Sequence, residues 1–107
     1  MAEVYTQVLA SFVGLADGDS LEVDTPAGYR MVLRNIDAAA GSSVDIPRLH
    51  FEDLDTGATF ILLYVGGLFL ESVQWEGRQA FNEGGGFRIT AENHAWDGRC
   101  TGFLLSL

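Results

Sequence analysis

The sequence predicts an all-β domain, an antiparallel β-sandwich or jelly roll of eight or nine short strands. Apolar and polar residues alternate with a period of two along most of the chain, which is the pattern of strands with one buried face. Turn residues separate these segments at near-regular spacing, as they do in sandwiches. No segment shows the apolar periodicity of an amphipathic helix. At 107 residues the chain fits one domain, residues 1–107, with a single core.

The first strands follow from alternation and turn chemistry. The segment 4–12 places Val8 and Phe12 on one face, and an Asp-Gly turn leads from it to the alternating segment 20–24. A Thr-Pro-Ala-Gly turn at 25–28 then opens the next strand, because Pro presets φ at the second position and Gly relieves crowding at the fourth.

In that strand Tyr29, Met31 and Leu33 oppose Arg30, Val32 and Arg34. The Ala-rich stretch 38–43 is too short to nucleate a helix and ends in Gly-Ser-Ser, so a loop is expected there. Residues 48–52 alternate again, with Leu49 and Phe51 on one face.

The segment 60–65 is apolar at every position, which suits a central strand covered on both faces or a strand whose outer face meets another subunit. Further strands are expected at 68–75, 79–81, 87–91 and 100–107. Glu76-Gly77, Gly84-Gly85-Gly86 and Asp97-Gly98 are the turn signals between them, and Asp97-Gly98 is the strongest two-residue hairpin signal.

The charge balance excludes some partners. Fifteen acidic residues against six Arg and no Lys give a formal net charge of -9, which would repel nucleic acid and anionic membranes. There is no 18-residue apolar span and no basic hydrophobic leader. We therefore expect a soluble, unprocessed protein that binds neither nucleic acid nor a membrane.

Chemistry-bearing residues do not form a catalytic pattern. No nucleophile, base and orienting group can be placed together on a predicted face, so no enzyme activity is expected. His50 and His94 lack metal-ligand spacing, and the acidic turn at 17–22 lacks the alternating oxygen ligands of an EF-hand. No metal, cofactor or catalytic residue is therefore predicted, and Cys100 is interpreted as a small buried side chain.

The exclusive use of Arg as the basic residue favours bidentate pairing with carboxylates. Arg30 and Arg34 alternate onto one face of the third strand, and Arg78 and Arg99 follow turn signals. Contacts between subunits and ion pairs within one subunit explain this pattern equally well.

Several segments together resemble a known class of protein. They are the Pro-Ala-Gly turn into a Val-x-Arg strand at 25–37, Trp75-Glu76-Gly77-Arg78, the Asn-Glu-Gly turn at 82–84, and the closing Gly-Phe-Leu-Leu strand at 101–105. In this order they resemble small β-sandwich virion proteins of tailed bacteriophages, over roughly residues 20–107.

The resemblance implies a capsid decoration (cement) protein, often a homotrimer, that binds the major capsid protein on the outer surface of the virion head after synthesis in the host cytoplasm. The acidic charge agrees with an outer surface rather than with packaged DNA. The candidate subunit or capsid contacts are Arg30, Arg34, Leu63, Arg78, Arg99 and Leu107.

Two other functions remain open from the sequence. A head-to-tail connector or tail accessory protein would also use a small β-sandwich, and it would form a ring or decorate the tail tube. A carbohydrate-binding module could use Trp75, Trp96 and Tyr29 as a sugar-stacking platform, although core packing explains these aromatic residues better.

Overall fold

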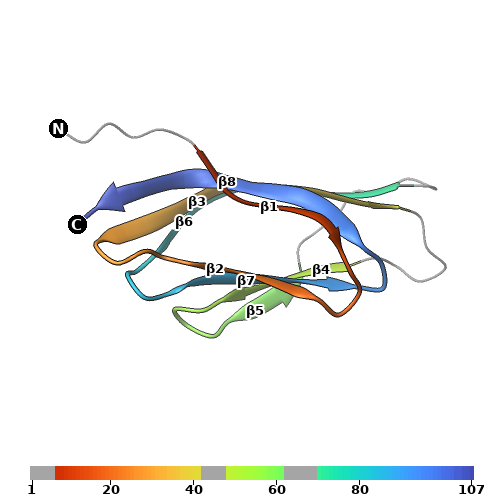
Figure 1. Cartoon of the computed structure of the whole chain (residues 1–107), viewed down its shortest axis with the longest axis horizontal. Coiled ribbons are helices and arrows are strands. Elements are labelled where there is room, and N and C mark those ends of the chain that lie inside the picture. The colour runs from red at the N-terminus through yellow and green to blue at the C-terminus, as the bar shows by residue number, and fades with distance from the viewer. Residues whose placement is uncertain (1–6, 42–47, 62–69) are drawn as a thin grey trace.

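The computed structural model describes residues 7–41, 48–61 and 70–107, which form strands and turns and no helix. Eight strands build two four-stranded antiparallel sheets that pack face to face (Figure 1), as expected for a β-sandwich. The strands are β1 (Gln7–Leu15), β2 (Ser20–Asp24), β3 (Tyr29–Gly41), β4 (Arg48–Asp53), β5 (Thr59–Ile61), β6 (Leu70–Phe81), β7 (Gly86–Glu92) and β8 (Trp96–Ser106).

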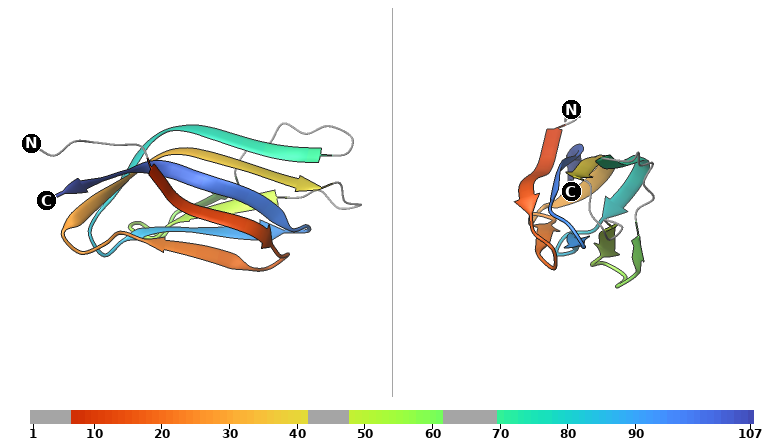
Figure 2. Two further views of the ribbon diagram at one scale, coloured as in Figure 1. Left: turned by 45° about the horizontal axis from the view of Figure 1, so that its top comes forward. Right: turned by 90° about the vertical axis from the view of Figure 1, so that its right-hand side faces the viewer.

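The strand order is β1-β8-β3-β6 in one sheet, here called sheet A, and β2-β7-β4-β5 in the other, sheet B. Every connection between consecutive strands crosses from one sheet to the other except the β4–β5 hairpin. The strand pairs β1·β8, β2·β7, β3·β6 and β4·β5 are therefore nested, which means that each pair lies between the two strands of the previous pair in chain order. The long strands of sheet A lie side by side over sheet B (Figure 2).

The core lies between the sheets and is built from the alternating residues that the sequence indicated. Leu49 and Phe51 of β4 are buried, as are Met31 and Leu33 of β3. Three phenylalanine rings meet at the centre: Phe51 lies 5.3 Å from Phe87 and 6.3 Å from Phe81, measured between ring centroids. Since Phe81 belongs to sheet A and the other two to sheet B, this cluster joins the two layers.

Irregularities run across sheet A at the level of Thr101. Relative to β8, strand β1 carries an extra residue between Val8 and Ala10, and β3 carries one between Leu33 and Asn35. Strand β6 adds another at the same level. Because each extra residue bends its strand and increases the local twist, these bulges together bend the sheet.

The bulge in β1 overturns one expectation from the sequence. Val8 and Phe12 were predicted on the same face, but Val8 is 54% exposed whereas Phe12 is 6% exposed and packs in the core. The register shift between Val8 and Ala10 interrupts the alternation, which the residue pattern alone does not reveal.

Several predicted boundaries were also wrong. Four strands have 9 to 13 residues and are not short. The expected loop at 38–43 is part of β3 up to Gly41. The predicted turn at Glu76-Gly77 lies inside β6, and the predicted hairpin at Asp97-Gly98 lies inside β8.

The turn before β3 forms one residue later than predicted. The Tyr29 N–H donates to Pro26 O at 3.2 Å, so Gly28 occupies the third position with a φ of 83°. A left-handed third residue is what a type II turn requires, and this explains the glycine.

The apolar segment 60–65 is only partly described. Its first residues belong to β5, which is an edge strand of sheet B, so the first of the two alternatives, a central strand, is wrong. The second, a strand whose outer face meets another subunit, stays a prediction. Residues 62–65 lie outside the described part of the chain.

Candidate functional site

The outer face of sheet B is covered by polar groups that pair with one another. Arg88 lies between two carboxylates, with Nη1 2.8 Å from Glu52 Oε1 and Nη2 3.4 Å from Glu22 Oε1. The three residues form one cross-strand row, because Glu22 and Glu52 both pair with Arg88 in the sheet register. In the next row, the hydroxyls of Ser20 and Thr90 are 2.7 Å apart.

A second charged group on this face gathers around Glu92. His50 Nε2 lies 2.6 Å from Glu92 Oε2, and Arg48 Nη1 lies 3.8 Å from the same oxygen. Both arginines on this face thus pair with carboxylates of the same domain.

Sheet A carries the four arginines without an ion pair. Arg48 and Arg88 pair as described, whereas no carboxylate among the described residues pairs with the remaining arginines, which are Arg30, Arg34, Arg78 and Arg99. These four are also the arginines that the sequence predicted as candidate contacts.

The direction of these side chains follows from their neighbours. Arg30 and Arg99 point away from the core because Met31 and Cys100, the next residues along their strands, are buried in it. Arg78 points outward because the following Gln79 bonds to buried Asp53.

Arg34 occupies the bulge of β3, between Leu33 and Asn35, and its side chain is half-buried. Its Nε atom is buried and has no hydrogen-bond partner. A buried donor with no acceptor in the described part of the domain is uncommon in folded proteins.

Two apolar side chains lie among the arginines on the same outer face. Val32 and Phe103 are cross-strand partners, and Val32 also pairs with Ala80. Val32 is 2% exposed and Phe103 9%, although neither belongs to the core between the sheets. We call Arg30, Arg34 and Arg78, together with Val32 and Phe103, the arginine patch.

Exposed apolar side chains also concentrate on sheet A. The large hydrophobic residues that are exposed in the described part of the chain are Val8, Val13, Tyr29 and Leu107. The first three lie in β1 and β3, and Leu107 follows β8, where its N–H donates to Gly28 O at 2.9 Å.

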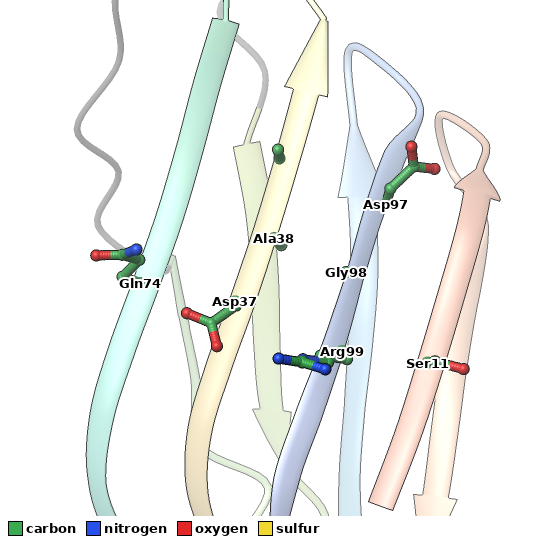
Figure 3. Close-up of a pocket in the computed structure, with 8 residues that line it drawn as sticks. Ser11, Asp37, Ala38, Gln74, Asp97, Gly98 and Arg99 are labelled. Atoms are coloured by element: carbon green, nitrogen blue, oxygen red, sulfur yellow. The ribbon is translucent and has the colours of Figure 1, made fainter. Parts of the chain in front are cut away.

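Farther along the strands, four polar side chains cross the outer face of sheet A in a line. The register pairs Ser11 with Arg99, Arg99 with Asp37, and Asp37 with Gln74, so one residue comes from each strand. Figure 3 shows this line, with Arg99 reaching from β8 toward β3, where Asp37 lies.

The line crosses a shallow hollow of about 480 Å³. Its lining, here called the polar hollow, consists of Ser11, Asp37, Ala38, Ala39, Gln74, Asp97, Gly98 and Arg99. The small side chain of Ala39 leaves the space open. Asp97 is partly engaged, since its Oδ1 accepts the Gly14 N–H at 2.6 Å.

A second hollow of about 490 Å³ adjoins the first and shares Asp37 and Gln74 with it. Asn35, Trp75 and Glu76 complete its lining. The two hollows therefore meet at Asp37 and Gln74, with the second lying toward β6.

The proposed sugar-stacking platform of three aromatic residues is not formed. Trp96 is fully buried in the core, and its indole N–H has no hydrogen-bond partner. Trp75 is half-buried against the core and lines the second hollow, whereas Tyr29 lies at the opposite end of β3. Of the remaining candidate contacts, Leu107 is 71% exposed and Leu63 lies outside the described residues.

The structure explains why Cys100 is a core residue and not a reactive group. Its thiol is fully buried, and burial, with a smaller contribution from the nearby Asp37 carboxylate, raises its pKa from 9.0 to about 12. The described residues contain no group of three or more His, Cys, Asp or Glu side chains that could hold a metal ion. Nor do they contain a helix long and apolar enough to span a membrane.

Sequence reasoning missed most of the polar hollow. Ser11, Asp37, Gln74 and Asp97 come from four different strands, and only the order of strands in sheet A brings them together. The one available signal was that Asp37 alternates with Asn35 on the same side of its strand.

No family model, curated protein or solved structure matches the chain.

Proposed function

We propose that this protein is a structural protein of a bacteriophage virion, a capsid decoration (cement) protein that binds the outer surface of the head and stabilises it. The proposal rests on the resemblance of its turn and strand segments to such proteins. The order β1-β8-β3-β6 over β2-β7-β4-β5 supports it, because nested strand pairs in two four-stranded sheets are the arrangement of jelly rolls, which occur in viral capsid proteins.

The arginine patch is the observation that carries the proposal. Arginine side chains are enriched in the centres of protein interfaces, where guanidinium groups bind carboxylates in a bidentate manner. The three arginines of the patch make no ion pair in the described part of the domain, and one of them has a desolvated donor without an acceptor. Acidic side chains on the major capsid protein would supply these acceptors.

The charge of the whole chain fits a complex in which the arginine patch faces the capsid. The formal net charge is -9, although four of the six arginines lie on sheet A. The remaining surface is therefore more acidic than the chain average. In the proposed complex the patch would face the capsid, and the acidic remainder would face solvent and help to keep particles apart.

The proposed assembly is a homotrimer. The exposed apolar side chains of Val8 and Val13 in β1, Tyr29 in β3 and Leu107 offer surface for contacts between subunits. Light scattering on the size-fractionated protein should give the mass of a trimer. A ring of six or more subunits would instead support a head-to-tail connector or tail accessory protein.

Binding to undecorated heads, assembled from the capsid protein of the same virus, tests the proposal directly. The wild-type protein should sediment with the heads, and raising the salt concentration should weaken the association, because exposed charges are screened. Replacing Arg30 and Arg78 together by Gln should weaken binding by roughly tenfold or more.

The matched control is Arg48→Gln, an arginine on sheet B that lies away from the patch. It should sediment as the wild type does. If the wild-type protein does not sediment with the heads, the proposed decoration function is wrong. If the double variant binds the heads as tightly as the wild type, the proposed docking role of the arginine patch is wrong.

A further inference from the structure

We propose that the polar hollow on sheet A binds a neutral saccharide. This site lies farther along the strands than the arginine patch and does not depend on the virion function. It also differs from the aromatic platform considered from the sequence, because Trp96 and Tyr29 do not line it.

The first argument is the contrast between the two sheet faces. On sheet B the cross-strand rows satisfy themselves, as Arg88 does with Glu22 and Glu52. On sheet A the side chains of Ser11, Asp37, Gln74 and Arg99 line up in the same manner, yet they make no hydrogen bond within the described part of the domain. Their hydrogen-bonding capacity therefore remains available to a ligand.

The mixture of hydrogen-bond donors and acceptors in the polar hollow suits a ligand with hydroxyl groups. Arg99 offers only donors and Asp37 only acceptors, whereas the Gln74 amide and the Ser11 hydroxyl offer both. A sugar presents several hydroxyls on adjacent carbons, each of which donates and accepts. Such a ligand can bond to a carboxylate and a guanidinium side by side, which a purely acidic or purely basic ligand cannot do.

Charge selects a neutral ligand. Asp37 and Asp97 outweigh Arg99 in the polar hollow, and Glu76 adds a further carboxylate in the adjoining one. The chain as a whole carries a formal net charge of -9. Sugars with a carboxylate or sulfate group are therefore disfavoured relative to uncharged ones.

Size and shape agree with a saccharide longer than one ring. Each hollow, at about 480 and 490 Å³, lies within the range of small-molecule sites, and the two are neighbours that share Asp37 and Gln74. The indole of Trp75 packs against the core beside its cross-strand partner Ile36, so the sugar would contact the polar side chains of Asn35 and Glu76 in the second hollow. The small side chain of Ala39 leaves room for a ligand in the first hollow.

The test is an NMR titration of the isotope-labelled protein with neutral sugars. The probes are glucose, galactose, mannose and N-acetylglucosamine, with maltose, cellobiose, lactose and chitobiose as two-ring forms. At least one should cause saturable shifts that are confined to the backbone of Ala39 and Gly98 and to the side chains of Gln74 and Arg99. A two-ring form should bind more tightly than its monosaccharide and should also shift the side-chain amide signal of Asn35 in the second hollow.

Three variants separate this site from nonspecific binding. Asp37→Asn and Arg99→Ala should each weaken binding roughly tenfold or more, because each removes hydrogen bonds that involve a charged group. Ala39→Leu should abolish binding by filling the hollow while keeping every polar group. Arg30→Ala, on the same sheet but outside the hollow, should leave binding unchanged.

Glucuronate provides the matched ligand control for glucose, and we expect it to bind more weakly. The proposal is overturned if none of the neutral sugars gives saturable shifts, if glucuronate binds as tightly as glucose, or if the shifts persist in Ala39→Leu. None of these measurements uses capsids, so their failure leaves the decoration function untouched.

Discussion

Gln79 and Asp53 link the two sheets through a single polar contact. The side-chain amide of Gln79 in β6 donates to Asp53 Oδ2 in β4 at 2.9 Å. Asp53 is only 9% exposed, and its other oxygen accepts the Asp55 N–H at 2.9 Å. A carboxylate at this depth depends on such donors, since water reaches it poorly.

Replacing Gln79 by Ala should therefore destabilise the domain by about 1–3 kcal/mol, because it leaves one oxygen of a buried carboxylate without a partner. Chemical denaturation monitored by tryptophan fluorescence measures the change. Gln74→Ala in the same strand is the control, because Gln74 is exposed, and it should shift stability by less than about 0.5 kcal/mol. Equal effects of the two substitutions would show that the Gln79–Asp53 bond contributes nothing.

Asp55 organises the turn between β6 and β7 from a different part of the chain. Its carboxylate accepts the N–H of Asn82 at 2.7 Å and that of Gly86 at 3.0 Å. Between them, a side-chain carbon on Gly85 would overlap the same carboxylate. We expect Asp55→Ala and Gly85→Ala each to cost about 1–3 kcal/mol, the first through lost hydrogen bonds and the second through overlap.

The two substitutions should not be additive. Once Asp55 has been truncated, the carbon added at position 85 has nothing to overlap, so Gly85→Ala should cost much less in the Asp55→Ala background. A double-mutant cycle in urea measures this coupling. Additive costs would mean that Gly85 is constrained by its backbone and not by Asp55.

The sequence predicted the fold class because the signals that define it are local. Alternation in β2 and β4, and the Gly-rich turn before β7, depend on residues next to one another in the chain. The bulges in β1, β3 and β6 depend instead on how neighbouring strands align, and no local signal reveals them. The bulge in β1 puts Val8 and Phe12 on different faces, and β6 joins the strands predicted at 68–75 and 79–81.

The same distinction applies to the candidate site. Arginine content singled out Arg30, Arg34, Arg78 and Arg99, and the strand order places all four on sheet A. The line of polar residues from Ser11 to Gln74 could not be predicted from the sequence. Its members are ordinary polar residues, and only the pairing of four strands aligns them.

Gly98 shows how a local signal can mislead. Asp97-Gly98 has the composition of a hairpin turn, yet the glycine lies inside β8, where close packing requires it. A side-chain carbon there would lie 2.6 Å from Asp37 O, 2.7 Å from the ring of Phe12 and 2.8 Å from the Ala38 methyl group.

Gly98→Ala should therefore destabilise the domain by about 1–3 kcal/mol through overpacking, as thermal or urea unfolding would show. Ala39→Ser is the control, because this neighbouring position faces the polar hollow and has space, and it should change stability by less than about 0.5 kcal/mol. A neutral Gly98→Ala substitution would indicate that β8 can move away from β3 and Phe12.

Cys100 makes stability depend on alkaline pH. Its pKa is raised from 9.0 to about 12, first by burial and second by Asp37, so the folded protein keeps the thiol proton that the unfolded chain loses above pH 9.0. The contribution of the neutral thiol is fully present below pH 9.0 and is lost as the pH rises toward 12. In that window the loss approaches about 1.4 kcal/mol per pH unit.

Comparison of the wild type with Cys100→Ala isolates this effect, because the other titrating groups are common to both. The stability of the wild type relative to the variant should be constant from neutral pH to pH 9.0 and should decrease above it. In the folded wild type the thiol should resist a disulfide exchange reagent near neutral pH and react only after unfolding. A parallel pH dependence of the two proteins, or rapid labelling of the native state, would show that Cys100 is accessible to solvent.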